Sequence, residues 1–300
     1  MYGYNRTVLI AGATGYLGQH LVRTYSEAGY WVRALARDET KLSAVRPWVD
    51  EVFIGEATDT ASIANICDGV DLVVSALGIT RQTDQLSYED VDYQANKNIL
   101  DRALEAGVER FAYIHILNAD QMPDVGVVKA KTRFVETLTD APIQSTILCP
   151  SGFFSDLSEV FKMAQSGRVY ILGEGTQRIS PIDGVDLAKR CVIATDAGEQ
   201  WVNVGGPETF DQLDIASLAF EALGAPEKIT HVPLWVGRLA LVATRVLGQK
   251  HLSGPMELFL AASSIDMSAP AYGQSRLIGT FRGLRTQTAD APTPLMGVEA

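Results

Sequence analysis

The sequence predicts a doubly wound α/β fold of the Rossmann type, followed by a smaller C-terminal substrate lobe. Over roughly the first 150 residues, short β-branched runs alternate with helix-length segments, which is typical of βαβ units and a parallel sheet. Glycines 12, 15 and 18 come directly after the first run and open the first helical pattern. We therefore expect a nucleotide-binding domain over residues 1–150 and a lobe mainly over residues 151–300.

The first strand is expected at residues 7–11. Apolar residues then recur at helical spacing from Leu17 to Ala28, and Gly29 suits the left-handed residue that ends a helix. Helices at 89–106 and 127–139 should cover the sheet, because their apolar residues recur every three or four positions. Further strands are expected at residues 31–36, 51–55, 71–77, 111–117 and 144–148.

The second half alternates less regularly, since glycines and prolines divide it into shorter pieces. Residues 183–195 are typical of a helix and residues 201–204 of a strand; both either return to the Rossmann sheet or belong to the lobe. Residues 235–247 are expected to form a helix that docks on the core. Residues 286–300 are rich in Thr, Ala and Pro and predict a frayed tail.

Composition excludes several classes of function. The chain has 25 Lys and Arg against 36 Asp and Glu, a net charge of -11, so nucleic acid is not an expected partner. Its three cysteines have neither metal-ligand spacing nor the even count of a disulfide framework, and we expect no metal. No targeting peptide is recognised, and a cytoplasmic protein is predicted.

Residues 235–247 are the most apolar late segment. Two arginines interrupt them, and they fall short of the roughly 20 residues that a membrane span needs, so no transmembrane segment is expected. An interfacial helix on a membrane surface remains the alternative to a helix that docks on the core.

The glycine-rich loop predicts a pyrophosphate site. Gly12 would permit the tight turn, Gly15 the close approach of the backbone to the phosphates, and Gly18 the packing of helix on strand. The anion would rest on free N–H groups at the helix N-terminus. The loop residues assigned to a dinucleotide site are therefore Gly12, Thr14, Gly15, Tyr16, Leu17 and Gly18.

The end of the second strand bears on which dinucleotide is bound. Arg37 offers a planar, permanently charged group suited to a 2′-phosphate, and Lys41 lies one helical turn further on. Asp38 is the competing signal, because an acid at this edge can accept hydrogen bonds from the ribose 2′-hydroxyl of NAD. We expect NADP(H), with NAD(H) as the less favoured cofactor.

Two other strand ends should face the cofactor. Ala76, Leu77 and Gly78 are at the end of the fourth strand, where small residues leave room for ribose and pyrophosphate. His115 is at the end of the fifth strand and brings an imidazole towards the nicotinamide; alternatively, it is a structural histidine satisfied by the backbone.

Together these residues resemble the short-chain dehydrogenase/reductase superfamily, in its atypical NAD(P)-binding branch of NmrA-like, isoflavone-reductase-like and divinyl-chlorophyllide-reductase-like proteins. The likeness spans nearly the whole chain. Residues 130–134 and 146–154 look most like the divinyl-chlorophyllide reductase pattern, although Cys149 stands where those enzymes usually have an arginine. The other supporting motifs are residues 12–18, 32–37, 73–78, 106–111 and 181–188.

The resemblance implies a departure from standard chemistry. Ordinary members use a serine and a Tyr-x-x-x-Lys pair, but here His115 occupies the apparent serine position and Val127 stands four residues before Lys131. Lys131, with Lys129 as the fallback, is expected to bind the nicotinamide ribose and to act as a proton donor; the alternative is a lysine pair on a solvated helix face. Pro150 and Phe153 are also placed at the cofactor.

The predicted function is an NADP(H)-dependent oxidoreductase that reduces a hydrophobic conjugated small molecule: an enone, a quinone or another activated double bond. A non-catalytic NADP(H)-binding redox sensor or scaffold is the first alternative. An epimerase or dehydratase is the second, disfavoured by the missing Tyr-x-x-x-Lys pair. Aromatic residues that could line a substrate cleft are Phe153, Phe154, Phe161, Tyr170, Trp235 and Phe259.

Overall fold

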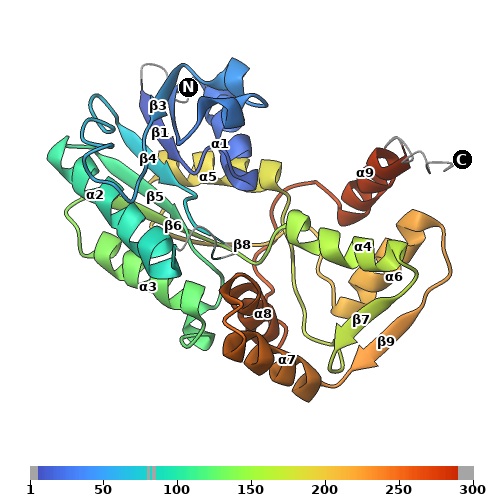
Figure 1. The fold of residues 1–300 in the computed structure, drawn as a ribbon. Helices are drawn as coiled ribbons and strands as arrows, with labels where there is room; N and C mark the ends of the chain where they lie inside the picture. Colours follow the sequence, from blue (N-terminus) through green and yellow to red (C-terminus); the bar gives the residue numbers. More distant parts are fainter. Residues whose placement is uncertain (1–5, 80–81, 83–85, 290–300) are drawn as a thin grey trace, which may run out of the picture.

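The computed structural model describes residues 6–79, 82 and 86–289. In this part of the chain, a seven-stranded sheet has the strand order β3-β2-β1-β4-β5-β6-β8, and every pairing in it is parallel. The predicted doubly wound fold is confirmed (Figure 1). The strand order reverses between β1 and β4, and ligands of such sheets bind outside the carboxyl ends of the strands at that point.

The sheet begins with three strands on one side of the reversal. Strand β1 (Thr7–Ala11) leads through the glycine loop into helix α1 (Tyr16–Glu27), which Gly29 follows at φ +88°, the left-handed conformation expected there. Strands β2 (Trp31–Ala36) and β3 (Glu51–Ile54) then extend the sheet outwards. Short 3₁₀ turns, rather than a full helix, join β2 to β3.

The other side of the sheet holds β4 (Leu72–Ser75), β5 (Arg110–Ile114) and β6 (Gln144–Pro150). Between β4 and β5, a π-helical segment (Glu89–Ala95) leads into α2 (Asn96–Glu105). The buried Asn96 amide donates to the carbonyl oxygens of Val91 and Asp92, and such a side chain inserted into the backbone ladder accounts for the wider turn. Helix α3 (Gly126–Thr139) then precedes β6.

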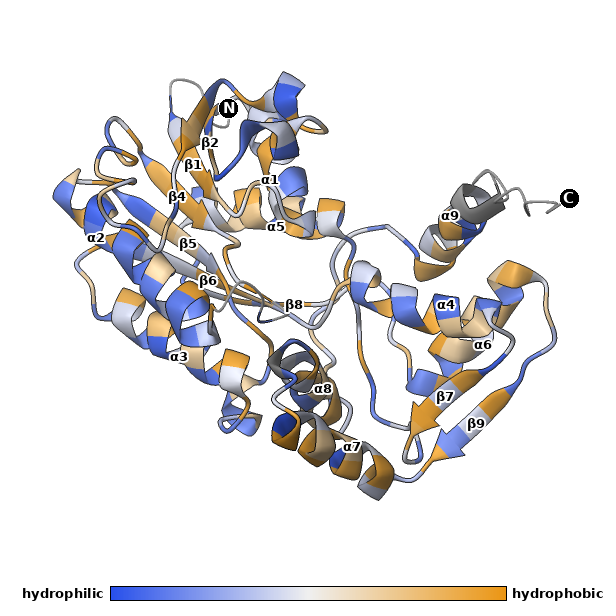
Figure 2. Cartoon of the chain, viewed as in Figure 1, coloured by the Kyte–Doolittle hydropathy of each residue, from blue (hydrophilic) through white to orange (hydrophobic). Residues whose placement is uncertain are grey.

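Residues 183–206, whose place the sequence left open, lie in the Rossmann layers. Helix α5 (Gly184–Ala197) packs against α1, and β8 (Trp201–Val204) pairs with β6. Helices α1 and α5 thus cover one face of the sheet, whereas α2 and α3 cover the other (Figure 1). Figure 2 shows apolar strands between these helix layers.

The remaining elements form the small lobe. Helices α4 (Ser158–Gln165), α6 (Gln212–Leu223) and α9 (Leu277–Ala289) surround a separate apolar core beside a two-stranded parallel sheet of β7 (Val169–Leu172) and β9 (Ile229–Val232). Phe154 and Phe161, two of the aromatic residues expected at a substrate cleft, are buried in that core. Helices α7 (Leu234–Val246) and α8 (Lys250–Ala262) pack on each other, and α8 contacts α3.

Several predicted boundaries are wrong. Strands β4 and β5 end two and three residues earlier than expected, so His115 follows its strand instead of lying within it. Residues 286–289 continue helix α9, where a frayed tail was expected; residues 290–300 lie outside the described part. Within the described ranges, none of the helices combines the length and apolar character that crossing a bilayer requires.

Candidate functional site: a dinucleotide cradle backed by a buried lysine

The glycine loop lies at the carboxyl end of β1. Gly12 has φ +83°, and a Cβ there would come within 2.9 Å of the Ala76 carbonyl group, so only glycine fits. A Cβ on Gly18 would lie 1.9 Å from the Gly12 carbonyl oxygen, so this glycine lets α1 pack directly on the turn. Both glycines therefore have the conformational role that the motif predicts.

The N-terminus of α1 is free for an anion. Gly15 is its N-cap residue and no side chain caps it, so the N–H groups of the first turn point out of the helix without a side-chain acceptor. This arrangement fits a pyrophosphate, which backbone N–H groups and the helix dipole would hold. Thr14 lines the pocket in front of the loop, whereas the Leu17 side chain packs in the core and can offer only its backbone.

One pocket brings together seven of the predicted cofactor residues: Gly12, Thr14, Gly15, Arg37, Ala76, Leu77 and Gly78. It opens at the carboxyl ends of β1, β2 and β4, on both sides of the reversal in strand order. The sequence interpretation missed the other lining residues, which come from the end of β2 and from the segments that follow β3 and β4: Leu35, Ala36, Gly55, Glu56, Ala57, Ile79, Leu86, Val91 and Ala95.

Arg37 and its neighbours form the rim of this pocket. The Arg37 guanidinium is 57% exposed and lies 3.6 Å from the Glu56 carboxylate. Asp38 is turned elsewhere, because its Oδ1 accepts hydrogen bonds from the backbone N–H and the hydroxyl of Thr40. These hydrogen bonds lower the pKa of Asp38. Asp38, which the sequence offered as a ribose-binding acid, is thus the N-cap residue of the 3₁₀ turn at residues 39–42.

Lys131 lies directly behind the pocket wall. A Cβ built on Gly78 would be 3.1 Å from Lys131 Nζ and 2.5 Å from Asp92 Oδ1, so the glycine lets both groups approach the pocket. Lys131 Nζ donates to the Tyr113 hydroxyl at 3.3 Å and to the Ile114 carbonyl at 3.2 Å. It also lies 3.4 Å from Asp92 Oδ1. Lys129, the fallback, is exposed on the same helix.

The charge state of this cluster follows from its contacts. Burial acts to lower the pKa of Lys131, but Tyr113 and Asp92 outweigh it, and the pKa of Lys131 is raised. Asp92 is fully buried, and burial raises its pKa. Within the described chain, its Oδ1 has no hydrogen-bond partner, while its Oδ2 accepts from the Ile79 N–H. The lysine is therefore held as an ammonium at neutral pH.

Asp92 and Tyr113 are the site residues that sequence reasoning missed. The Tyr-x-x-x-Lys spacing predicts a tyrosine four residues before Lys131 on the same helix, but Val127 occupies that position. The phenol that contacts Lys131 belongs instead to Tyr113 on strand β5. Tyr113 is fully buried, and burial raises its pKa to about 12. Residues 111, 113 and 115 alternate along the strand, so period-two reasoning could have placed Tyr113 beside His115.

His115 is buried and uncharged. It is 4% exposed, its backbone N–H donates to the Leu148 carbonyl, and its ring meets the Trp201 ring edge-on at 6.2 Å. Burial, together with the Lys131 charge, lowers the pKa of His115 to about 3. Its Nδ1 is buried without a hydrogen-bond partner among the described residues. The backbone N–H of His115 is therefore hydrogen-bonded, whereas, within the described chain, Nδ1 of its imidazole is not.

Tyr16 and Phe153 lie together at the far end of the glycine loop. Their rings meet edge-on at 5.9 Å, and the Tyr16 hydroxyl accepts the Gly184 N–H, so this residue fastens the loop to the start of α5. Burial raises the pKa of Tyr16 to about 12. Pro150 is buried at the end of β6, opposite Val204. None of these three predicted cofactor residues lines the pocket at Arg37.

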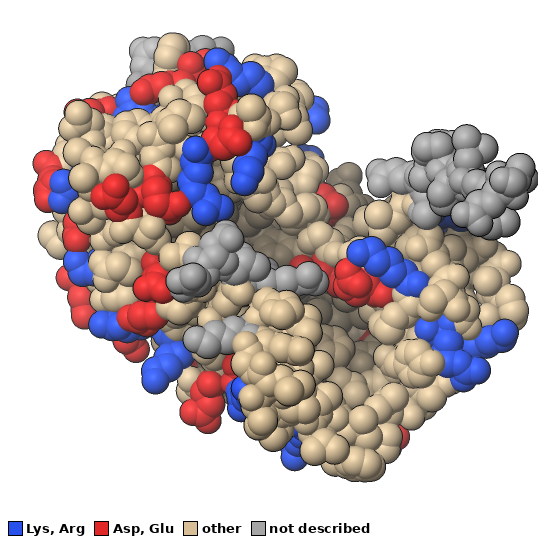
Figure 3. All heavy atoms as spheres, viewed as in Figure 1, with Lys and Arg blue, Asp and Glu red and all other residues tan. Residues whose placement is uncertain are grey.

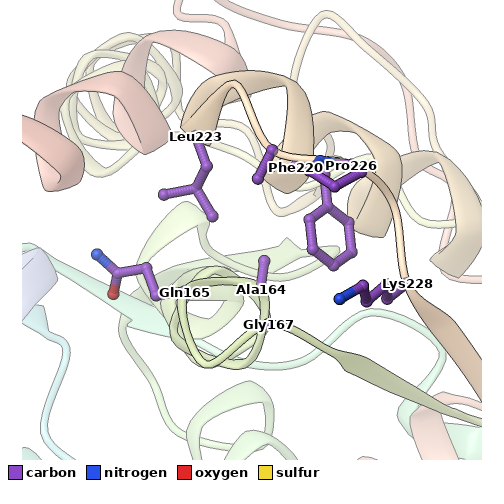
Figure 4. Close-up of a pocket in the computed structure, with 8 residues that line it drawn as sticks. Ala164, Gln165, Gly167, Phe220, Leu223, Pro226 and Lys228 are labelled. Carbon is purple, nitrogen blue, oxygen red and sulfur yellow. The ribbon is translucent and has the colours of Figure 1, made fainter.

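A second hollow belongs wholly to the small lobe. Figure 4 shows it between the end of α4 and the end of α6, with Phe220, Leu223 and Lys228 around it. It holds one lysine and no carboxylate or imidazole among its lining residues, so it offers little chemistry. Within the described chain, no group of three His, Cys, Asp or Glu side chains could hold a metal ion.

A protein-family model described as NAD(P)H-binding matches residues 12–179. Photosystem II assembly factor Ycf39 of Cyanophora paradoxa is 27% identical over 233 residues, which are 76% of this chain and 72% of that protein. The chloroplastic divinyl chlorophyllide a 8-vinyl-reductase of Arabidopsis thaliana is 28% identical over 254 residues, 76% of this chain but only 60% of that protein.

Among solved structures, the Escherichia coli NADPH-dependent quinone oxidoreductase QOR2, complexed with NADPH, superposes with a TM-score of 0.75. The two chains are 17% identical, and the match covers 93% of this chain and 100% of that one. A UDP-glucose 4-epimerase from Thermotoga maritima matches at a TM-score of 0.62 over 76% of this chain, with 15% identity. These likenesses concern the fold.

Proposed function

Because the chain belongs to the NAD(P)H-binding family, we propose that it is an NADP(H)-dependent oxidoreductase of the atypical short-chain type that reduces a hydrophobic conjugated small molecule. The observation that carries the proposal is the ammonium of Lys131. It lies immediately behind the pocket wall at Gly78 and is held in place by Tyr113 and Asp92. An ammonium at this point can stabilise the negative charge that develops on a carbonyl oxygen during reduction.

The chemistry requires a hydride and a proton. When bound, the dinucleotide supplies hydride to the substrate. In an enone or quinone, the electron pair of the attacked double bond moves to the carbonyl oxygen, which then needs a positive charge or a proton nearby. Lys131 can supply both, and water can return its proton. Asp92 acts as a positioning residue, because its Oδ1 lies 3.4 Å from Lys131 Nζ while its Oδ2 accepts the Ile79 N–H.

Arg37 supports NADP(H) over NAD(H). Its guanidinium stands at the rim of the pocket with one partner, the exposed Glu56, and exposed ion pairs of this kind contribute only about 0–1 kcal/mol. The guanidinium is therefore free to reorient towards a 2′-phosphate. Asp38, whose carboxylate already accepts two hydrogen bonds from Thr40, is a poor ribose acceptor.

The substrate class is supported by the relatives and not by a mapped cleft. A quinone oxidoreductase shares the fold, and a vinyl reductase is related in sequence; both names describe reduction of conjugated systems. Quinones and enones are accordingly the first acceptors to test. The cytoplasmic location and the absence of a nucleic-acid partner stay predictions.

A non-catalytic NADP(H) sensor is the second candidate. Two observations favour it: the tyrosine beside Lys131 is buried away from solvent, and His115 is uncharged at neutral pH. Neither can serve as the exposed acid of an ordinary member of the superfamily. In this case the Asp92–Lys131 pair would stabilise only the bound ribose.

The test is NADPH oxidation in the presence of a panel of quinones and enones, comparing Lys131→Met with Lys129→Met. Both variants remove one ammonium from helix α3, but only Lys131 lies behind the pocket wall at Gly78, whereas Lys129 is exposed on the same helix. We expect the first to lower kcat about 100-fold, within the range for a lost proton donor, and the second to change it less than twofold. NADPH that binds tightly but is oxidised by no acceptor would favour the sensor.

A further inference from the structure

Helix α7 exposes an apolar face to solvent. Trp235, Leu239, Val242 and Val246 follow one another at steps of four, three and four residues, so they share one side of the helix. Their side chains are 65%, 61%, 53% and 80% exposed. We call these four residues the α7 face. The expectation that residues 235–247 dock on the core holds only for the opposite side of α7, where Gly237 packs against Leu260 of α8 and Leu172 of β7.

The apolar surface continues beyond α7. Leu247 and Leu252 at the turn into α8, and Phe259 on α8, are also exposed. Figure 2 shows apolar residues along both helices, and Figure 3 shows a broad surface with few charged atoms over them. Monomeric proteins rarely leave an apolar patch of this kind uncovered, so the patch indicates a partner surface.

The charge around the α7 face is mainly positive, with Glu257 of α8 as the acidic exception. Residues 228–256 contain four Lys or Arg and no Asp or Glu, although acidic residues outnumber basic ones 36 to 25 in the whole chain. Arg238 and Arg245 follow Trp235 and Val242 by three residues each, so they flank one side of the face. Arg245 pairs with Glu257, whereas Arg238 has no ion-pair partner in the described chain.

We propose that the α7–α8 hairpin docks on an anionic lipid bilayer, with the α7 face among the acyl chains and the arginines at the headgroups. An amphipathic helix with tryptophan and leucine on one side and arginine beside them is typical of an interfacial helix. Its 13 residues span about 20 Å, too short to cross a hydrocarbon core of about 30 Å. The proposal does not depend on the proposed enzymatic function.

A second copy of the chain fits this surface less well. In a two-fold dimer each α7 face meets its own equivalent, so both copies bring the same basic residues, Arg238 and Arg245, to the contact. A bilayer of anionic lipid instead supplies the opposite charge along the whole flank. The charge pattern therefore favours lipid over self-association.

The experiment is co-sedimentation of the full chain with vesicles of phosphatidylcholine alone and with added phosphatidylglycerol. We expect binding to the anionic vesicles that weakens at high salt. Trp235→Ser/Leu239→Ser should lower the vesicle partition coefficient by more than about tenfold, because two large apolar side chains would no longer leave water on binding. Trp31→Ser is the matched control, since Trp31 is 54% exposed at the start of β2, away from the hairpin.

Circular dichroism verifies that each variant is folded. Arg238→Glu should weaken binding to anionic vesicles and leave binding to neutral vesicles unchanged. Absence of sedimentation with anionic vesicles at low salt would overturn the proposal. So would equal binding by the double variant and the wild-type chain, or a dimer in solution that the double variant abolishes, because the face would then be covered by a second copy.

Discussion

Arg37 is the residue on which the choice of cofactor depends. Replacing it with alanine should weaken NADPH binding by about 1–3 kcal/mol, the value of a charge-assisted hydrogen bond, and should leave NADH binding nearly unchanged. Isothermal titration with both cofactors measures the difference. Lys41→Ala is the control, because Lys41 is exposed on the following 3₁₀ turn and does not line the pocket. Equal losses for NADPH and NADH would remove Arg37 from the phosphate site.

His115 should make the protein sensitive to mild acid. Its folded-state pKa of about 3 lies below the 6.5 of an unfolded histidine, so only the unfolded chain takes up this proton between those values. Above pH 6.5 the group has no effect; as the pH falls towards 3, stability is lost at up to about 1.4 kcal/mol per pH unit.

Urea unfolding at pH 7.5 and pH 5 measures that loss. His115→Leu should reduce the difference between the two unfolding free energies, whatever its packing cost at pH 7.5. An unchanged difference would mean that another group carries the acid sensitivity.

At the same scale, the sequence predicted the residues whose roles are local. Gly12 and Gly18 could be identified because a turn and a helix start each have a short-range signature, and Arg37 could be placed at the pocket because it follows a strand end. Asp92 and Tyr113 could not, since they meet Lys131 only after a π-helical segment, a strand and a helix from separate parts of the chain have packed together.

At the scale of elements, the close packing of α1 on the glycine loop (residues 12–18) maintains the predicted pyrophosphate site. Gly18→Ala would place a methyl group 1.9 Å from the Gly12 carbonyl oxygen, so helix and loop must separate. We expect a loss of at least about 1–3 kcal/mol of unfolding free energy, typical of overpacking, and more than tenfold weaker NADPH binding. Gly279→Ala in α9 is the control, because nothing lies within 4 Å of its Cβ position. Tight NADPH binding by Gly18→Ala would refute the close packing.

The regular half of the fold was predictable, and the lobe was not. Strands β1 and β2 appear at their predicted bounds, because both consist mainly of apolar residues, and Arg33 is the only charged residue in either. Strands β7 and β9 pair across 60 residues, and neither has a distinctive local pattern. The sequence predicted helix α7. It could not predict that the apolar α7 face is exposed, because exposure depends on how the other elements pack around the helix.

At the scale of the whole molecule, Asp186 ties the C-terminal segment to the Rossmann part. Its Oδ2 accepts the backbone N–H groups of Gln274 and Ser275, just before α9. Asp186→Ala should lower the unfolding free energy by about 1.5–3 kcal/mol, because hydrogen bonds to a charged acceptor are lost. It should also speed proteolysis near residue 275. Glu159→Ala, which removes an exposed ion pair, should cost less than about 1 kcal/mol. Equal stability of the two variants would contradict the role of Asp186.

The central claim is that this molecule transfers hydride to a conjugated acceptor. A reaction with NADPH deuterated at the transferable position, followed by mass spectrometry of the quinone or enone product, tests it most directly. We expect one deuterium in an enone product, bound to carbon, and about 100-fold slower formation of that labelled product when Lys131→Met replaces the wild-type chain. For a quinone, we expect the hydroquinone to form at the same rate as NADPH is oxidised. Bound NADPH that stays unoxidised with every acceptor would contradict the account.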